Sequence, residues 1–212
     1  MLKVYGFARV NEMARGNTRD LRVLWALEEM GLPHQIVGLD HPNHDLDSPS
    51  YRALNPFGQI PVIDDDGVVV SESGAILLYL ARKTGKLLPG DLAGEAQVLR
   101  WSVAALNSVE PPLLSVWFVN ISGGKGSKPS EALRQWSEMR LQQLDGWLAD
   151  RSFIATDEFT VADILMSHVL SIGAHQDLLK PHQNILAYQA RCTERPAWKR
   201  TLDAYFKRVE AA

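Results

Sequence analysis

The sequence NPFGQIPVIDDDGVVVSESGAILLYLAR, residues 55–82, carries the strongest structural signals in the chain. Residues 60–63 and 68–70 are apolar runs rich in β-branched side chains, and Asp-Asp-Asp-Gly between them is a turn sequence. This pattern predicts a β-hairpin. Residues 74–82 have helical composition, with apolar side chains that recur at helical spacing. We therefore expect a hairpin that leads directly into a helix.

Two features of this stretch predict a binding site for a small acidic peptide. Pro61 cannot donate a backbone hydrogen bond, so it is expected at a strand start or edge. If its peptide bond is cis, the N–H and C=O of Ile60 face outward and can pair with an extended peptide. Ser73 stands in the first turn of the expected helix, where free N–H groups and the helix dipole attract a carboxylate.

The residues upstream predict a mixed sheet. Residues 2–7 and 34–39 are expected strands, and residues 19–30 between them have the apolar spacing of a helix that ends at Gly31. A β-α-β unit followed by a hairpin and a helix implies a mixed sheet with helices on both sides. Residues 41–49 are polar and are expected to form a loop.

The remainder of the chain is predicted to be helical. Leu87–Asp91 has the composition of a linker, and long helical segments are expected near residues 95–119 and 130–150. We therefore predict an α/β domain over residues 1–85 and an all-α domain over residues 92–212.

Composition argues against several classes of function. The 212 residues carry a formal net charge of −3, with no basic patch interleaved with aromatic side chains, so a nucleic-acid partner is disfavoured. No apolar stretch approaches the length of a membrane span, and no signal peptide precedes the first strand. The single cysteine cannot form an intramolecular disulfide, and the six histidines form no metal-ligand cluster. The chain is expected to be cytoplasmic, with no membrane partner and no metal.

Signatures spaced along the chain resemble those of the glutathione transferases. The motif Asn-Pro-x-Gly-x-Val/Ile-Pro is present as Asn55–Pro61, and the Glu/Gln-Ser pair that precedes a helix is present as Glu72–Ser73. Arg22–Pro33 upstream, with Phe159–Ile164 and Arg195–Trp198 downstream, extends the resemblance over nearly the whole chain. The resemblance implies a thioredoxin-like N-terminal domain, an all-α C-terminal domain and glutathione as the co-substrate.

The resemblance also implies which residues bind glutathione. Glu72 and Ser73 would hold its γ-glutamyl end, and the backbone of Ile60 would pair with the cysteinyl backbone. Gln59 either reaches the same ligand or completes the turn. The cation that some family members supply for the glycyl carboxylate is missing here; His44 is one substitute, and an exposed loop histidine is the other interpretation of that residue.

Thr18 is the leading candidate for activating the thiol of glutathione. It lies just ahead of the helix expected at residues 19–30, where a hydroxyl can donate to a thiolate and the helix N-terminus favours the anion. The segment resembles the Asn-Ser-Arg arrangement of bacterial family members, with Thr in place of Ser. A plain helix N-cap is the alternative interpretation of Thr18, and Asn17 and Arg15 compete for the catalytic role.

Several other residues are assigned structural roles. Tyr5 invites comparison with the tyrosine-type transferases, but it precedes the helix by too many residues, so packing is favoured. Cys192 lies in the helical half, where a lone cysteine is usually a small buried hydrophobe. Thr160 and Asp163 have the spacing of a capping box, so Asp163 is predicted to stabilise a helix and to take no part in catalysis.

The function implied is glutathione S-transferase activity, in which the thiolate of glutathione attacks a hydrophobic electrophile. The electrophile is expected between the domains, against apolar side chains of the helical domain: Trp101, Ala104, Ala105, Pro111 and Leu113. A homodimer and a role in detoxification are expected from the family. Two alternatives stay open. One is a glutathione-dependent disulfide or peroxide reductase, in which Asn17 and not Thr18 stabilises the thiolate. The other is a non-catalytic interaction module that keeps the fold.

Overall fold

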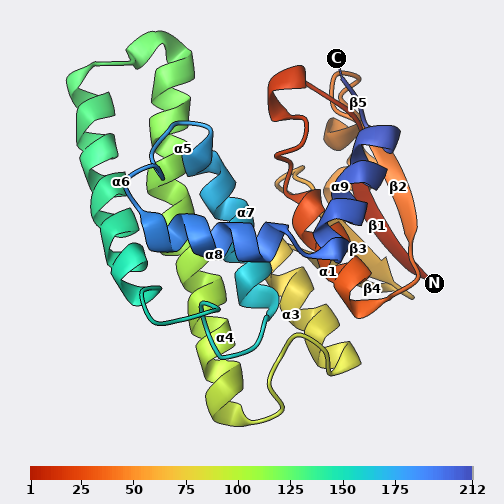
Figure 1. The fold of residues 1–212 in the computed structure, drawn as a ribbon. Helices are drawn as coiled ribbons and strands as arrows, with labels where there is room; N and C mark the ends of the chain where they lie inside the picture. Colours follow the sequence, from red (N-terminus) through yellow and green to blue (C-terminus); the bar gives the residue numbers. More distant parts are fainter. Residues whose placement is uncertain (212) are drawn as a thin grey trace. The chain divides into compact units, whose positions relative to one another are not determined.

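The computed structural model describes residues 1–211, which divide into two compact units. The first unit contains residues 1–86 and the chain from Arg195 onward, and the second contains Leu87–Glu194. Every strand of the described chain belongs to the first unit, whereas the second is helical (Figure 1). The architecture is thus a small mixed sheet with its helices, followed by a helical region.

A five-stranded mixed sheet forms the framework of the first unit. Its strands are β1 (Leu2–Val10), β2 (Gln35–Asp40), β3 (Val62–Asp65), β4 (Val68–Ser71) and β5 (Glu210–Ala211). β2 and β5 pair with β1 in parallel, and β3 runs antiparallel to both β1 and β4, in the order β2-β1-β3-β4. Asp66 and Gly67 join β3 to β4 with positive φ angles of 51° and 95°, as tight hairpin turns require. The predicted hairpin and mixed sheet are confirmed.

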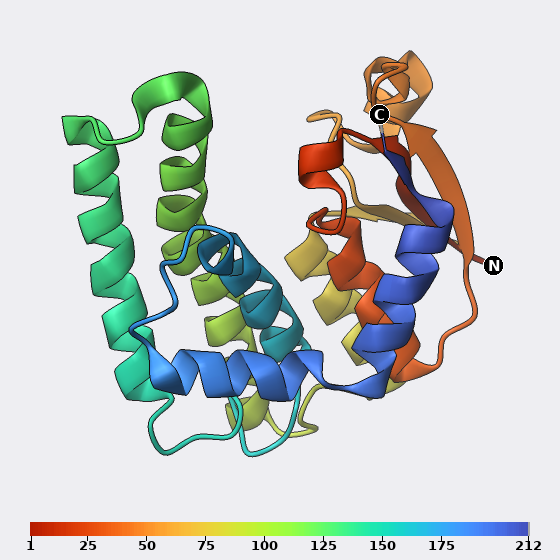
Figure 2. The ribbon, with the colours of Figure 1, turned by 45° about the horizontal axis from the view of Figure 1, so that its top comes forward.

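Helices cover both faces of this sheet. They are α1 (Asp20–Met30), α2 (Pro49–Leu54), α3 (Ser73–Thr84) and α9 (Pro196–Arg208). α1 contacts both α3 and α9, and the three lie side by side in Figure 2. Gly6 of β1 faces α1, because a Cβ there would lie 2.8 Å from Asp20 Oδ2. Tyr5, which points to the opposite face, packs against Tyr51 of α2 with ring centroids 5.9 Å apart.

The second unit is a group of packed helices. Its elements are α4 (Leu92–Ala104), α5 (Glu110–Val119), α6 (Lys128–Trp147), α7 (Val161–Ala174) and α8 (Gln183–Thr193), with π-helical turns at Ala105–Val109 and Asn120–Gly124. α7 is buried along most of its length and contacts α4, α5 and α8. The predicted capping box is present at its start, where the Thr160 N–H donates to Asp163 Oδ2 at 2.8 Å.

The last segment of the chain differs from the expected domain limits. The sequence places residues 195–212 in the helical domain, but α9 packs on α1 in the first unit and β5 extends its sheet. The rings of Trp25 and Trp198 lie 4.7 Å apart, and Arg195 Nε donates to Glu29 Oε1 at 2.6 Å. The apolar face of a helix shows that the helix packs, but not against which partner, so sequence alone could not assign α9.

Residues 41–49 also differ from the expected loop. They contain a 3₁₀ turn at Asp45–Asp47, and α2 begins at Pro49. Ser48 caps α2 by accepting from the Tyr51 N–H, and proline is favoured at the first helical position. The Ser-Pro pair was therefore a helix start signal, obscured by the short length of the helix that follows.

Candidate functional site

The segment before β3 lies beyond the paired part of the sheet. The Ile60–Pro61 peptide bond is cis, and the ladder pairs of β3 begin at Val62. Val62 pairs with Ser71 of β4 in antiparallel register. Continuing that register by two residues places Ile60 across from Ser73, at the start of α3. The backbone of Ile60 and the first turn of α3 therefore follow the same end of the β3–β4 pair.

The carbonyl of Gln59 fixes the backbone that leads into Ile60. It accepts from Tyr51 Oη at 2.9 Å and from Asn55 Nδ2 at 2.8 Å. The Gln59 side chain is exposed, whereas Ile60 is buried in a cluster that includes Tyr51. The Asn55 side chain thus stabilises the turn of the motif through the Gln59 carbonyl, and the exposed Gln59 side chain can reach a ligand.

The start of α3 presents a hydroxyl and free backbone N–H groups. Ser73 is the first helical residue and is 5% exposed, and Glu72 before it is exposed. Glu72 has a φ of 67°, a conformation that residues with a Cβ seldom adopt and that concentrates at functional sites. The first N–H groups of a helix have no partner within it, so this end attracts an anion.

Arg22 of α1 supports Ser73 from behind. Its guanidinium is 1% exposed, and Nη1 donates to Ser73 Oγ at 3.2 Å. Because Arg22 donates, the proton of the Ser73 hydroxyl is left to point elsewhere. In the sequence, Arg22 was notable only as part of a motif. Its position one turn into α1 was the only sign of a role at the site, because the sequence does not show a contact with a residue 51 positions away.

Thr18 lies just before α1, about one helical turn ahead of Arg22 in the chain. It is 7% exposed, and its Oγ1 donates to Tyr205 Oη of α9 at 2.7 Å. The N-cap of α1 is Arg19, whose side chain makes no capping hydrogen bond. The hydroxyl of Thr18 is engaged by α9. Asn17 is half-buried beside it.

Asp20 is a buried carboxyl beside Thr18. Burial raises its pKa, and hydrogen bonding from Thr18 and from the Phe7 N–H, at 3.1 Å, opposes the rise, as does the charge of Arg208. Within residues 1–211, Asp20 Oδ1 has no well-formed hydrogen-bond partner. In the sequence, Asp20 carries no functional signal, because an acidic residue in the first turn of a helix is ordinary.

The other sequence candidates lie in different surroundings or have local partners. Tyr5 packs on the α2 face of the sheet, and Cys192 is fully buried in α8 of the second unit. Arg15 donates through Nε to the Val209 carbonyl at 2.8 Å. His44 is exposed and lies 3.1 Å from Asp47 in the loop before α2.

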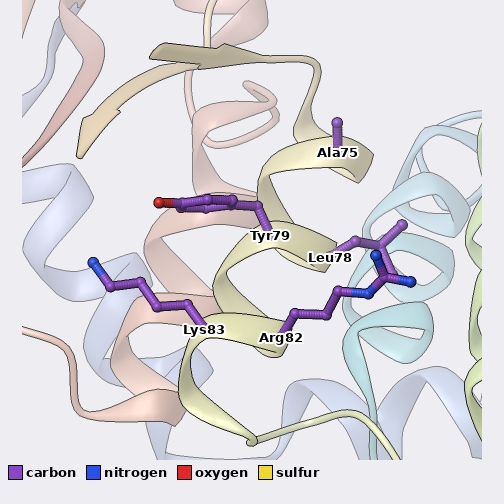
Figure 3. Close-up of a pocket in the computed structure, with 5 residues that line it drawn as sticks. All are labelled: Ala75, Leu78, Tyr79, Arg82 and Lys83. Carbon is purple, nitrogen blue, oxygen red and sulfur yellow. The ribbon is translucent and has the colours of Figure 1, made fainter. Parts of the chain in front are cut away.

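A cavity of about 650 Å³ lies on the outer side of α3 and does not include the candidate residues. It is lined by Ala75, Leu78, Tyr79, Arg82 and Lys83 (Figure 3). Tyr79 Oη donates to Asp65 Oδ2 at 2.7 Å, and Lys83 pairs with the same carboxylate. These groups satisfy one another and leave the start of α3 as the better site for an anionic ligand.

Over residues 1–211, no group of three or more His, Cys, Asp and Glu side chains is arranged to hold a metal ion. Over the same residues, none of the helices combines the length and apolar character needed to cross a membrane.

Comparison with known proteins places this geometry in a family. The model of the glutathione S-transferase N-terminal domain matches residues 21–83, and the model of the C-terminal domain matches residues 106–196. The chain therefore belongs to the glutathione S-transferase family. Glutathione S-transferase 3 of Schizosaccharomyces pombe is 30% identical over 200 residues, which cover 85% of this chain and 81% of the relative.

Solved structures agree with this assignment. A glutathione transferase family member from Pseudomonas fluorescens, solved with two glutathione molecules bound, has a TM-score of 0.83 and 26% identity. The alignment covers 95% of this chain and 92% of the other. A glutathione transferase from Pseudomonas putida, with one glutathione disulfide bound per subunit, has a TM-score of 0.83 and 28% identity, with 95% and 90% covered.

Proposed function

We propose that this protein binds glutathione, activates its thiol and conjugates it to a hydrophobic electrophile. The observation that carries the proposal is the junction of two helix starts: Arg22 of α1 donates to Ser73 of α3, at the end of the β3–β4 pair that Ile60 precedes. The first unit thereby combines three features: a backbone at Ile60 that can bind a peptide, a helix end at Ser73 that can bind a carboxylate, and the hydroxyl of Thr18 ahead of α1.

The γ-glutamyl end of glutathione binds at the start of α3. Its carboxylate accepts from the Ser73 hydroxyl and the first N–H groups of the helix, and the Arg22 charge behind Ser73 favours the anion. The exposed Glu72 carboxylate accepts from the glutamyl ammonium group. The backbone of Ile60 pairs with the cysteinyl backbone as in strand addition, and Gln59 contacts the same ligand.

Thr18 activates the thiol by donating its hydroxyl proton to the sulfur anion. The N-terminus of α1 adds its positive dipole end, which lowers a thiol pKa. Asn17 is the competing donor, and free backbone N–H groups are the third possibility. Glutathione supplies the nucleophile, and the protein supplies orientation and charge stabilisation.

The remaining expectations belong to the same proposal. The electrophile contacts apolar side chains of the helical unit, among which Trp101 stacks on Trp147 with ring centroids 5.0 Å apart. Ala105 and Leu113 are buried, as helical core residues also are. The protein acts in the cytoplasm as a homodimer in detoxification, which is typical of the family.

Reduction of glutathione disulfides or peroxides is the second candidate function. The Pseudomonas putida relative was solved with glutathione disulfide bound, which favours this chemistry. The single cysteine, Cys192, is buried in α8, so a mixed disulfide with the protein is disfavoured as an intermediate. A reductase of this kind would use the same glutathione site.

Calorimetry with glutathione, followed by two assays, tests the proposal. We expect binding, turnover of a halonitroarene and little turnover of a mixed glutathione disulfide. The reverse pattern of turnover would establish the reductase. Binding without either activity would indicate a non-catalytic module, and absence of binding would remove the proposed site.

A further inference from the structure

The C-terminal helix α9 holds the loop that carries the candidate catalytic residues. Arg15 donates to two carbonyls at the end of α9, from Nε to Val209 at 2.8 Å and from Nη2 to Phe206 at 2.9 Å. Its guanidinium also lies 5.1 Å from the centroid of the Phe206 ring. Gly16 approaches the same ring so closely that a Cβ would lie 2.8 Å from it. These contacts join the loop before α1 to α9.

α9 also supplies the direct partner of Thr18. The 2.7 Å bond between the Thr18 and Tyr205 hydroxyls is buried, because Thr18 is 7% and Tyr205 1% exposed. Arg208, one turn further along α9, donates through Nη1 to the Phe7 carbonyl and lies with Nη2 3.9 Å from Asp20 Oδ2. The titratable and charged groups around Thr18 are thus Tyr205 and Arg208 from α9, Asp20 from α1 and Arg15 from the loop.

The Thr18 hydroxyl has one proton for two neighbours. As placed, it donates to Tyr205 Oη, while hydrogen bonding between Thr18 and the Asp20 carboxyl also lowers the pKa of that carboxyl. A hydroxyl carries one proton and two acceptor lone pairs, so Thr18 can donate to a third group only by giving up its donation to Tyr205 or Asp20. The contact with Tyr205 is kept if Tyr205 then donates to the Thr18 oxygen. The phenol of Tyr205 stays protonated and can act as the donor, because burial raises its pKa.

We propose that Tyr205 is a positioning residue for thiol activation: when sulfur binds, Tyr205 donates to Thr18, and Thr18 turns its own proton to the thiolate. No proton changes owner in this step; two hydroxyl protons rotate. The inference rests on the proposed role of Thr18. A chain of two hydroxyls stabilises the anion more than one hydroxyl does, because each hydrogen bond polarises the next.

Tyr205→Phe tests this inference, because it removes one hydroxyl and keeps the ring. The ultraviolet absorbance of the thiolate, followed against pH in the glutathione-saturated protein, reports the pKa of the bound thiol. We expect that pKa to rise by about half a unit in Tyr205→Phe, with turnover below that pKa reduced accordingly. At pH values above the shifted pKa, turnover should match that of the wild type. The dissociation constant of glutathione at acid pH should also be unchanged.

Tyr188→Phe is the matched control. Tyr188 is also 1% exposed, and its hydroxyl donates to Asp163 in the second unit, far along the chain from Thr18. Its loss should lower stability and leave the thiol titration unchanged. If Tyr205→Phe does not fold, 3-fluorotyrosine at position 205 replaces it: a more acidic phenol donates more strongly, so the thiol pKa should fall below that of the wild type.

A double variant separates the inference from the proposed function. If Tyr205 acts through Thr18, the titration of Thr18→Val/Tyr205→Phe should coincide with that of Thr18→Val alone. Additive shifts would overturn the inference, and so would a normal titration in Tyr205→Phe or fluorotyrosine when Thr18→Val is shifted. A normal titration in Thr18→Val itself would remove the proposed role of Thr18, and the inference with it.

Discussion

Each unit contains a buried cluster of a threonine, an aspartate and a tyrosine at the start of a helix. The two clusters differ in how completely the carboxylate of the aspartate is hydrogen-bonded. In the second unit, the closed cluster consists of Thr160, Asp163 and Tyr188. Both carboxylate oxygens of Asp163 are used. Oδ2 accepts from the backbone and side chain of Thr160, at 2.8 and 3.1 Å, and Oδ1 accepts from Tyr188 Oη and from a backbone N–H.

In the first unit, the open cluster consists of Thr18, Asp20 and Tyr205. Burial raises the pKa of Asp20 as it does that of Asp163, yet Asp20 Oδ1 has no well-formed partner within the described residues. Thr18 shares one proton between two neighbours. Buried polar groups that lack full satisfaction are costly and concentrate at functional sites. We interpret the closed cluster as structural, and the open cluster is the one that we propose to serve the ligand.

Replacement of Asp163 by Asn should give the largest effect. The amide would place an N–H₂ group where a carboxylate oxygen now accepts two hydrogen bonds, which leaves two buried donors without an acceptor. At about 1–3 kcal/mol for each lost buried bond, we expect the free energy of unfolding to fall by about 3 kcal/mol. Urea unfolding measures this. Glutathione affinity of the folded fraction should not change, and a selective loss of affinity at full stability would contradict the structural role.

Replacement of Ser73 by Ala should weaken glutathione binding without unfolding the protein. The hydroxyl that Arg22 leaves free is lost, and hydrogen bonds to a charged group are worth about 1.5–3 kcal/mol, so the dissociation constant should rise by one to two orders of magnitude. Ser137→Ala is the control, since that buried hydroxyl donates within α6 to the Leu133 carbonyl at 2.9 Å. Calorimetry that finds equal affinities in both variants would remove Ser73 from the site.

Replacement of Asp20 by Asn should have the smallest effect on stability. The amide oxygen can accept from the Phe7 N–H, and the N–H₂ group can occupy the place of the oxygen that lacks a partner. We expect a change of less than about 1 kcal/mol at neutral pH, measured by urea unfolding. A loss as large as that of Asp163→Asn would break the distinction between the two clusters.

The pH dependence of the Asp20→Asn effect sharpens the same comparison. Burial raises the pKa of Asp20 in the folded state above its ordinary value of 3.8, so the folded protein binds the proton more tightly than the unfolded chain. The stability that this supplies is complete below the ordinary pKa and is lost as pH rises through the raised pKa. The stability of the wild type relative to Asp20→Asn should therefore fall from acid to neutral pH. A difference that is constant with pH would contradict the raised pKa.

The capping box of the closed cluster, Thr160 and Asp163, and most of the fold could be predicted from sequence because their signals are local, whereas the contact of Tyr188 with Asp163 could not. The capping box spans four consecutive residues, and the hairpin is specified by the turn between two apolar runs. The open cluster could not be predicted. Thr18 and Tyr205 are separated by 187 residues, and a tyrosine in an amphipathic helix gives no signal of its partner. The assignment of α9 to the first unit was missed for the same reason.

The thiol pKa of bound glutathione is the property that activation by Thr18 should change. It is obtained from the thiolate absorbance of the glutathione complex against pH, in the wild type, Thr18→Val and Asn17→Ala. The account predicts a bound pKa below that of free glutathione, a rise of about one unit in Thr18→Val, equivalent to about 1.4 kcal/mol, and little change in Asn17→Ala. Identical titrations in the wild type and Thr18→Val would contradict it, and a shift confined to Asn17→Ala would assign thiol activation to Asn17.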